Sequence, residues 1–177
     1  MAHSIIIVSV PEAEPFVAAL RERFDPAAGR GLGAHITLLY PFMAPERIDG
    51  AVLGRLAAVA AGVAPFAFQL THLARFAGTL YLAPEPPAPF VALAVQLLQE
   101  FPELRPRGWR AEALVPHLSV VRKSDVDDRA VQAQLEAVLA ERGPIACRCR
   151  AFLLIENSTG AWRPIQAFPL TGAVVGR

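Results

Sequence analysis

Cysteine and long apolar runs are scarce in this chain of 177 residues, and each scarcity excludes a class of protein. The two cysteines, Cys147 and Cys149, lie two residues apart, a spacing at which an extended chain does not close an ordinary disulfide. We expect two buried thiols rather than a disulfide framework or a zinc site, which would need further ligands at fixed spacings. No apolar run approaches the roughly 18 residues that span a bilayer, and residues 1–8 lack the basic segment and cleavage site of a signal peptide. These features predict a cytoplasmic protein that does not enter membranes.

Charge of either sign is also sparse, because only 19% of the residues are charged and the formal net charge is +1. The basic residues are sixteen arginines and the single Lys123. This balance excludes the broadly basic surface of a protein that binds duplex DNA, so a nucleic-acid ligand must be small or gripped locally. The hydrophobic share of 54% supplies a full core and excludes intrinsic disorder. The wealth of arginine, alanine and proline is typical of a bacterial genome rich in G and C.

Apolar residues recur with the two-residue period of strands in some segments and with the helical period in others. Prolines and glycines separate these segments, as they do at helix ends and in turns. The patterns predict helices near residues 16–24, 46–63, 90–101 and 125–139, and strands near residues 4–10, 34–40, 66–72, 79–82, 114–122, 145–155 and 163–170. Together they predict an α+β fold in which two antiparallel sheets are flanked by helices.

The order of elements repeats along the chain. Residues 34–83 and 115–170 both show a strand, a helix, a proline, a second strand, a turn and a third strand. We therefore expect a single domain over residues 1–177, with two lobes formed by these repeats. A pseudo-two-fold axis would relate the lobes across a central cleft.

One short motif occurs at equivalent places in the two repeats. Residues 35–39 read His-Ile-Thr-Leu-Leu, and residues 117–121 read His-Leu-Ser-Val-Val. On a strand, the histidine and the hydroxyl residue of each motif lie on one face about 6.7 Å apart, while the apolar residue between them points to the other face. The other two histidines lack this pattern. A lone histidine on an apolar strand is most often a core residue, but its recurrence with a hydroxyl favours a functional site.

The paired motifs suit proton transfer around phosphorus. One imidazole must accept a proton and the other must donate one near neutral pH, and the ordinary pKa of histidine, about 6.5, allows both. This makes His35 and His117 the candidate catalytic residues. The hydroxyls of Thr37 and Ser119 would donate hydrogen bonds to phosphate oxygens, and we expect no metal ion because the sequence offers no evident carboxylate cluster.

These motifs resemble those of the 2H phosphoesterase superfamily, whose mark is two His-x-Thr/Ser-hydrophobic motifs, and within it the 2′-5′ RNA ligase-like and cyclic phosphodiesterase branch. The resemblance implies an enzyme of RNA processing without a cofactor, which hydrolyses 2′,3′-cyclic phosphodiesters of RNA ends or nucleotides to 2′-phosphates. It also implies that His35 and His117 act as acid and base, and that Thr37 and Ser119 bind the phosphate.

Many members of this family carry an aromatic residue or an arginine five positions after each histidine, where this chain has Tyr40 and Arg122. We expect both to bind substrate, with Arg122 as a phosphate clamp, although an exposed arginine at a strand end is the alternative. Strict alternation along a strand would direct both side chains away from the histidine face. A bulge or a strand end must therefore intervene.

Recognition of a base is less clearly encoded. The aromatic residues that could stack on a base, or that could simply pack, are Phe42, Tyr81, Trp109 and Trp162. Arg105, Arg107 and Arg110 flank Trp109 and could contact an RNA end, or could be ordinary solvated charges.

Three functions stay open from the sequence. The first is the cyclic phosphodiesterase, acting as a monomer on an RNA 2′,3′-cyclic phosphate end or a small cyclic nucleotide. The second is a non-catalytic module that binds RNA ends or nucleotides. The third is an enzyme of the same fold that acts as a 2′-5′ RNA ligase or on another substrate, such as ADP-ribose cyclic phosphate or a cyclic oligonucleotide.

Overall fold

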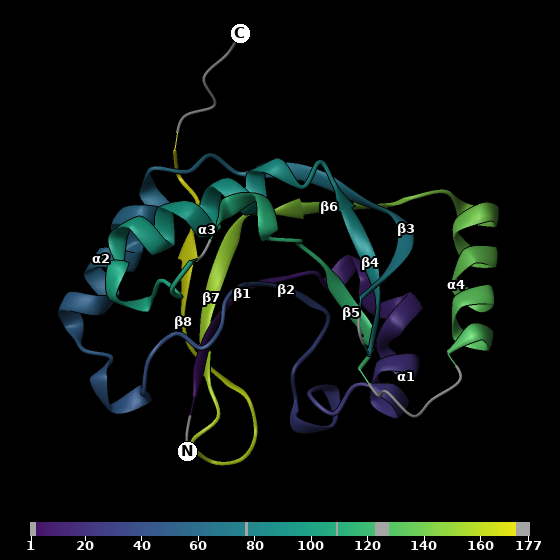
Figure 1. Cartoon of the computed structure of the whole chain (residues 1–177), viewed down its shortest axis with the longest axis horizontal. Helices are drawn as coiled ribbons and strands as arrows, with labels where there is room; N and C mark the ends of the chain where they lie inside the picture. The colour runs from purple at the N-terminus through teal and green to yellow at the C-terminus, as the bar shows by residue number, and fades with distance from the viewer. Residues whose placement is uncertain (1–2, 77, 109, 123–127, 173–177) are drawn as a thin grey trace, which may run out of the picture.

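The computed structural model describes residues 3–76, 78–108, 110–122 and 128–172, which form two four-stranded antiparallel sheets (Figure 1). Sheet A contains, in order, β2 (His35–Leu39), β1 (Ser4–Ser9), β7 (Ala151–Glu156) and β8 (Arg163–Pro169). Sheet B contains, in order, β5 (Leu118–Val121), β4 (Thr79–Glu85), β3 (Phe66–Phe76) and β6 (Ile145–Cys149). The predicted α+β fold with two antiparallel sheets is confirmed.

The helices flank the sheets in two pairs. α2 (Gly50–Ala61) packs against β8 and α3 (Ala88–Glu100) against β2, on the side of sheet A. α1 (Glu14–Phe24) packs against β5 and α4 (Arg129–Arg142) against β3, on the side of sheet B. The two pairs therefore lie at opposite ends of the molecule (Figure 1). Within the described residues, no helix is both long and apolar enough to cross a membrane.

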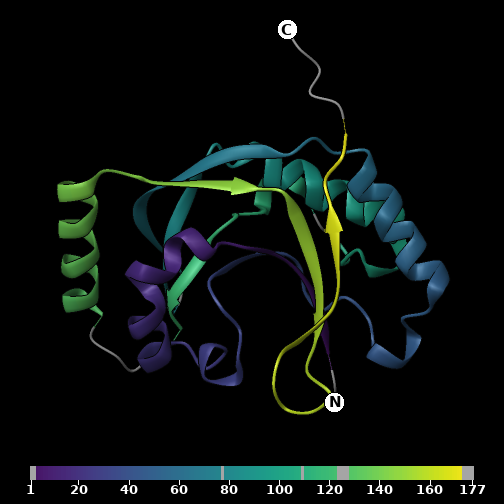
Figure 2. The ribbon, with the colours of Figure 1, turned by 180° about the vertical axis from the view of Figure 1, so that it is seen from behind.

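The strands of the two repeats are exchanged between the sheets, so the expectation that each repeat forms its own lobe needs a correction. Sheet A joins β2 of the first repeat to the β7–β8 hairpin of the second, and sheet B joins β5 of the second repeat to the β3–β4 hairpin of the first. The predicted strand over residues 145–155 is interrupted at Arg150, where the chain leaves sheet B and enters sheet A (Figure 2). Alternation of apolar residues is local and does not report which strand is the partner.

Helix starts also differ from the sequence prediction. The second predicted helix begins at Gly50 because the side chain of Asp49 caps it, accepting a hydrogen bond from the Val52 amide at 2.9 Å. Residues Pro45–Arg47 form a separate 3-10 turn. The predicted start of the fourth helix, near residue 125, lies outside the described residues.

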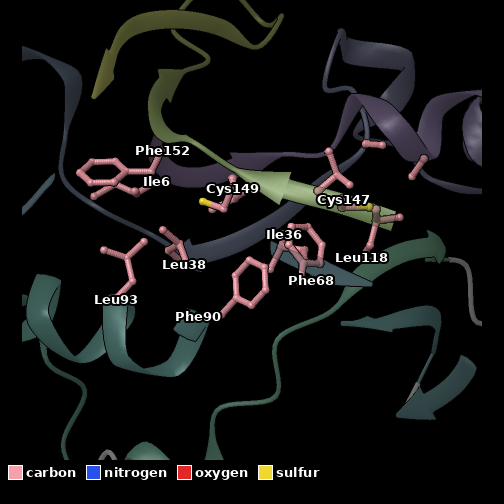
Figure 3. Packing of buried hydrophobic residues seen from close by; sticks show 14 of the residues in the cluster. Ile6, Ile36, Leu38, Phe68, Phe90, Leu93, Leu118, Cys147, Cys149 and Phe152 are labelled. Carbon is pink, nitrogen blue, oxygen red and sulfur yellow. The ribbon is translucent and has the colours of Figure 1, made fainter. Parts of the chain in front are cut away.

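One apolar core joins the two sheets (Figure 3). Ile36 and Leu118, which follow the two motif histidines, are both 0% exposed and belong to this core. Cys147 and Cys149 are free thiols buried in the same core, and burial raises the pKa of each to about 12. The motif strands are therefore anchored by their apolar residues, and the thiols have a packing role.

A buried ion pair connects α1 to sheet B. The guanidinium of Arg21 donates to Asp25 Oδ2 at 2.9 Å and to the Ser119 carbonyl at 3.2 Å, and both charged side chains are 1% exposed. The other oxygen of Asp25 accepts from the Ala27 amide at 3.0 Å. Neither buried charge is left without a partner, which is the condition for tolerating an ion pair in a core.

We predict that Asp25→Asn lowers the free energy of unfolding by about 3–5 kcal/mol, because it leaves the Arg21 cation buried without a counter-charge. Asp128→Asn is the matched control, since the Asp128 pair with Arg75 lies near the surface and should be worth about 0–1 kcal/mol. Urea denaturation of the three proteins measures the difference. Equal stability of the two variants would contradict the structural role of the buried pair.

Candidate functional site

The two motif strands are edge strands that meet. β2 forms one edge of sheet A and β5 one edge of sheet B, and Cα atoms of the two strands approach within 8 Å. A cavity of about 280 Å³ opens between them. Its lining includes the six residues to which the sequence analysis assigned catalysis or substrate binding, namely His35, Thr37, Tyr40, His117, Ser119 and Arg122.

Each motif strand carries an irregularity at the same position. Along the β1–β2 pair, Ile7 is opposite Thr37 and Ile6 is opposite Leu39, so that Leu38 is the extra residue. Along the β4–β5 pair, Tyr81 is opposite Ser119 and Leu80 is opposite Val121, so that Val120 is the extra residue. A bulge of this kind lets two consecutive residues face the same side of a sheet.

The bulges return Tyr40 and Arg122 to the histidine side. Leu38 and Leu39 are both buried, as are Val120 and Val121, and the residue that follows each strand lines the cavity. In the sequence, the bulge is indicated by the two consecutive apolar residues at the end of each motif, where a regular strand would alternate.

The two imidazoles are held in the same way. Nδ1 of His35 lies 2.7 Å from the Gly33 carbonyl oxygen, and Nδ1 of His117 lies 2.7 Å from that of Val115. Because a carbonyl oxygen only accepts, Nδ1 is the donor in both rings. Nε2 of each ring is thus the nitrogen left to exchange a proton with a ligand.

The loop in front of His35 is itself fastened by α1. The Glu14 carboxylate accepts a hydrogen bond from the Ala34 amide at 2.5 Å. A Cβ atom on Gly33 would come within 2.7 Å of the same carboxylate oxygen, so the close approach depends on glycine at this position. Glu14 therefore helps to position the carbonyl group that orients the His35 ring.

Burial shifts both histidines toward the neutral form. His35 is only 7% exposed, and burial lowers its pKa to about 4, against the opposing effect of its bond to Gly33 and with a further lowering by the charge of Arg21. His117 is half-buried, and burial also lowers its pKa below the ordinary 6.5. Both imidazoles are therefore neutral at neutral pH, and a bound anion would raise both pKa values.

Aromatic rings surround His117. Its ring lies edge-on to Phe76, with the centroids 4.8 Å apart, and 5.4 Å from that of Tyr81. Phe76 is 41% exposed and lines the cavity, so it is a surface on which an unsaturated ring could stack. The sequence analysis missed Phe76 because it ends a strand in which exposed and buried aromatic residues look alike.

The aromatic residues considered for stacking on a base lie in different environments. Phe42 is 2% exposed and packs edge-on against Phe101 in the core, so of its two possible roles the structure supports packing and not stacking on a base. Tyr81 is also buried, beside His117, whereas Trp162 lines the cavity. Trp109 lies outside the described residues.

The predicted arginine cluster before the second motif does not contribute to the described part of the cavity wall. None of Arg105, Arg107 and Arg110 lines the cavity, but Arg30 does, and the sequence analysis did not identify it. Arg30 lies between Gly29 and Gly31, in a short glycine-rich stretch that matches no known binding motif, so only the fold brings it to the site.

α1 holds the second motif from behind. Arg21 donates to the carbonyl of Ser119, and the backbone amide of Arg122 donates to the carbonyl of Phe24 at 2.9 Å. These bonds fix the position of the end of β5 relative to α1. Arg21 also lies close enough to His35 for its positive charge to lower the pKa of that histidine. Among the described residues, no group of three or more His, Cys, Asp or Glu side chains could hold a metal ion.

Comparison with solved structures shows a shared fold at low sequence identity. TT0787 of Thermus thermophilus superposes with a TM-score of 0.67 at 20% identity, covering 97% of this chain and 100% of that chain. E. coli LigT complexed with 3′-AMP gives a TM-score of 0.62 at 15% identity, covering 96% of this chain and 98% of that chain. The crystal structure of a phosphoesterase gives a TM-score of 0.60 at 18% identity, covering 97% of this chain and 99% of that chain.

The family itself is shown by sequence. No curated protein matches the chain significantly. The model of the 2′-5′ RNA ligase superfamily, however, matches residues 9–161, a span that contains both His-x-Thr/Ser motifs. The chain therefore belongs to the 2′-5′ RNA ligase superfamily, and with it to the 2H phosphoesterases that its paired motifs resemble.

Proposed function

We propose that this protein is a metal-independent phosphoesterase that hydrolyses 2′,3′-cyclic phosphodiesters of RNA ends or nucleotides to 2′-phosphates. The observation that carries the proposal is the symmetry of the cavity. Two imidazoles, each tied through Nδ1 to a backbone carbonyl and each beside a hydroxyl residue, line one space. Such a pair can remove one proton and supply another within a single reaction.

In this mechanism His35 is the general base. Its deep burial keeps it neutral, so its Nε2 can take a proton from a water molecule. The water oxygen forms a new bond to phosphorus, and the bond from phosphorus to the 3′ oxygen breaks. His117, less deeply buried, gives its proton to the departing 3′ oxygen. The two histidines then exchange protons with solvent and return to their initial states.

The remaining site residues stabilise negative charge. The hydroxyls of Thr37 and Ser119 donate to the non-bridging oxygens, whose charge grows in the transition state. Arg122 adds a positive charge at the end of β5, and Tyr40 borders the substrate at the end of β2. The phosphate also supplies the anion that raises the pKa of His117 enough for it to carry the acidic proton.

Two features of relatives favour further uses of the same site. The matched family is named for 2′-5′ RNA ligation, in which a ribose hydroxyl would replace water as the nucleophile on the same phosphorus. E. coli LigT has been crystallised with 3′-AMP, NADP⁺ and ATP, which supports nucleotides as ligands of this fold.

We also propose that the whole chain acts as one domain and one monomer, since all six site residues come from a single chain.

We predict that His35→Ala and His117→Ala each lower kcat by a factor of about 10² or more, the usual scale of general acid–base catalysis. His72→Ala is the control, since His72 is exposed on β3 and lies outside the cavity lining. Turnover of a nucleoside 2′,3′-cyclic phosphate is measured with a chelator present. Activity that is lost in the presence of a chelator and restored by a divalent metal would contradict the proposed metal-independent mechanism.

We predict smaller effects for the hydroxyls. Thr37→Val and Ser119→Ala each remove one hydrogen bond to a charged oxygen, worth about 1.5–3 kcal/mol, so kcat/KM should fall by about 10-fold to 150-fold. Thr71→Val, on β3 and outside the cavity lining, should have no effect. If Thr37→Val folds normally and keeps full activity, the phosphate must be held by other groups.

We predict a bell-shaped dependence of kcat/KM on pH with its optimum below pH 6.5. Activity should rise as His35 loses its proton, near pH 4, and fall as His117 loses its proton, at a pKa below 6.5. The falling limb of the kcat profile should lie at higher pH, because bound phosphate raises the pKa of His117. Initial rates between pH 3.5 and 9 test this, and a flat profile from pH 5 to 8 would show that these histidines do not carry the protons.

A further inference from the structure

The cavity has a positively charged extension that hydrolysis at the two histidines does not require. A second hollow of about 230 Å³ is lined by Asp25, Pro26, Ala27, Arg30 and Arg122. Ala27, Arg30 and Arg122 line both this hollow and the main cavity, so the two spaces adjoin. Two guanidinium groups therefore border the passage between them.

The charge of this extension is not neutralised within the part of the chain that the structure describes. Among the described residues of its lining, Asp25 supplies the only carboxylate, which is occupied by Arg21 and by the Ala27 amide. No hydrogen bond or ion pair to another described side chain engages the guanidinium of Arg30 or of Arg122. Two like charges at one concave surface raise the local concentration of anions.

The backbone fixes the points from which both side chains extend. The carbonyl of Arg30 accepts a hydrogen bond from the Trp162 amide at 2.8 Å, and the following Gly31 has a φ of 86°, a conformation that favours glycine. The amide of Arg122 is tied to the Phe24 carbonyl at 2.9 Å. Flexible side chains on fixed backbone positions suit a subsite that closes on a ligand.

A different part of the main cavity borders an apolar hollow. This hollow of about 250 Å³ shares Thr37, Tyr40 and His117 with the cavity, and leucine, alanine, valine and proline side chains complete its lining. It contains no arginine, lysine or carboxylate among its described lining residues. Of these two hollows, only the one lined by Arg30 and Arg122 offers cations to a ligand whose reacting phosphate lies between the histidines.

We propose that Arg30, together with Arg122, forms a second phosphate subsite, and that the preferred substrate carries a phosphate on the 5′ oxygen of the nucleotide that bears the cyclic phosphate. This inference rests on the proposed function and narrows its substrate class. It favours 5′-phosphorylated nucleotides and the ends of RNA chains over nucleoside 2′,3′-cyclic monophosphates. Arg122 serves both phosphates, whereas Arg30 acts on the second one.

The test compares adenosine 2′,3′-cyclic phosphate with and without a 5′-phosphate. In the wild-type protein the 5′-phosphate should raise kcat/KM by at least about tenfold, as expected for charge-assisted hydrogen bonds of about 1.5–3 kcal/mol. Arg30→Gln should abolish this gain and leave the rate with the unphosphorylated compound within about twofold of wild type. Arg47→Gln, at an exposed arginine outside both linings, is the matched control and should retain the gain.

Binding separates this proposal from the proposed activity. Adenosine 2′,5′-bisphosphate should bind at least about tenfold more tightly than adenosine 2′-phosphate, and Arg30→Gln should remove the difference, whether or not the protein turns over a cyclic phosphate. If both cyclic compounds are hydrolysed at equal rates and both products bind equally, the subsite is wrong while the activity stands. If neither compound is hydrolysed but the binding difference depends on Arg30, the activity is wrong and the subsite stands.

Discussion

The contact between the edge strands β2 and β5 is the constraint on which the rest of the molecule depends. Each strand buries one face in the common core, through Ile36 and Leu118, and presents the other face to the cavity. An edge strand leaves backbone groups unpaired, and natural proteins cover such edges. Here two edges lie against each other, and the hollow between them is the candidate site.

The exchange of hairpins explains why the two strands meet. If each repeat formed its own sheet, its motif strand would pair with its own hairpin. Instead, β2 is completed by β7 and β8 through β1, and β5 by β4 and β3. Each half of the site therefore depends on strands from both repeats, which makes the cavity a property of the whole fold and not of either repeat.

Burial determines the electrostatics of the site. The same packing that orders the two imidazoles removes water from them and lowers both pKa values, most strongly for His35. The buried cation of Arg21 is neutralised by Asp25, so it can anchor the Ser119 carbonyl without leaving an unpaired charge. Positive charge that is free to meet a ligand lies instead at Arg30 and Arg122, at the border of the cavity. A site in which neutral histidines lie beside exposed arginines is suited to an anionic ligand.

The sequence by itself predicted the α+β class, the buried thiols, the paired motifs and six of the residues that line the cavity, because periodicity and spacing report locally which face of a strand is buried. The need for a bulge or a strand end before Tyr40 and Arg122 followed from alternation alone. Only the tertiary structure decided the exchange of hairpins, the core position of Phe42 and the arrival of Phe76, Arg30 and Glu14 near the histidines. Those features depend on contacts between segments far apart in the chain, and local patterns carry no information about which distant segments pair.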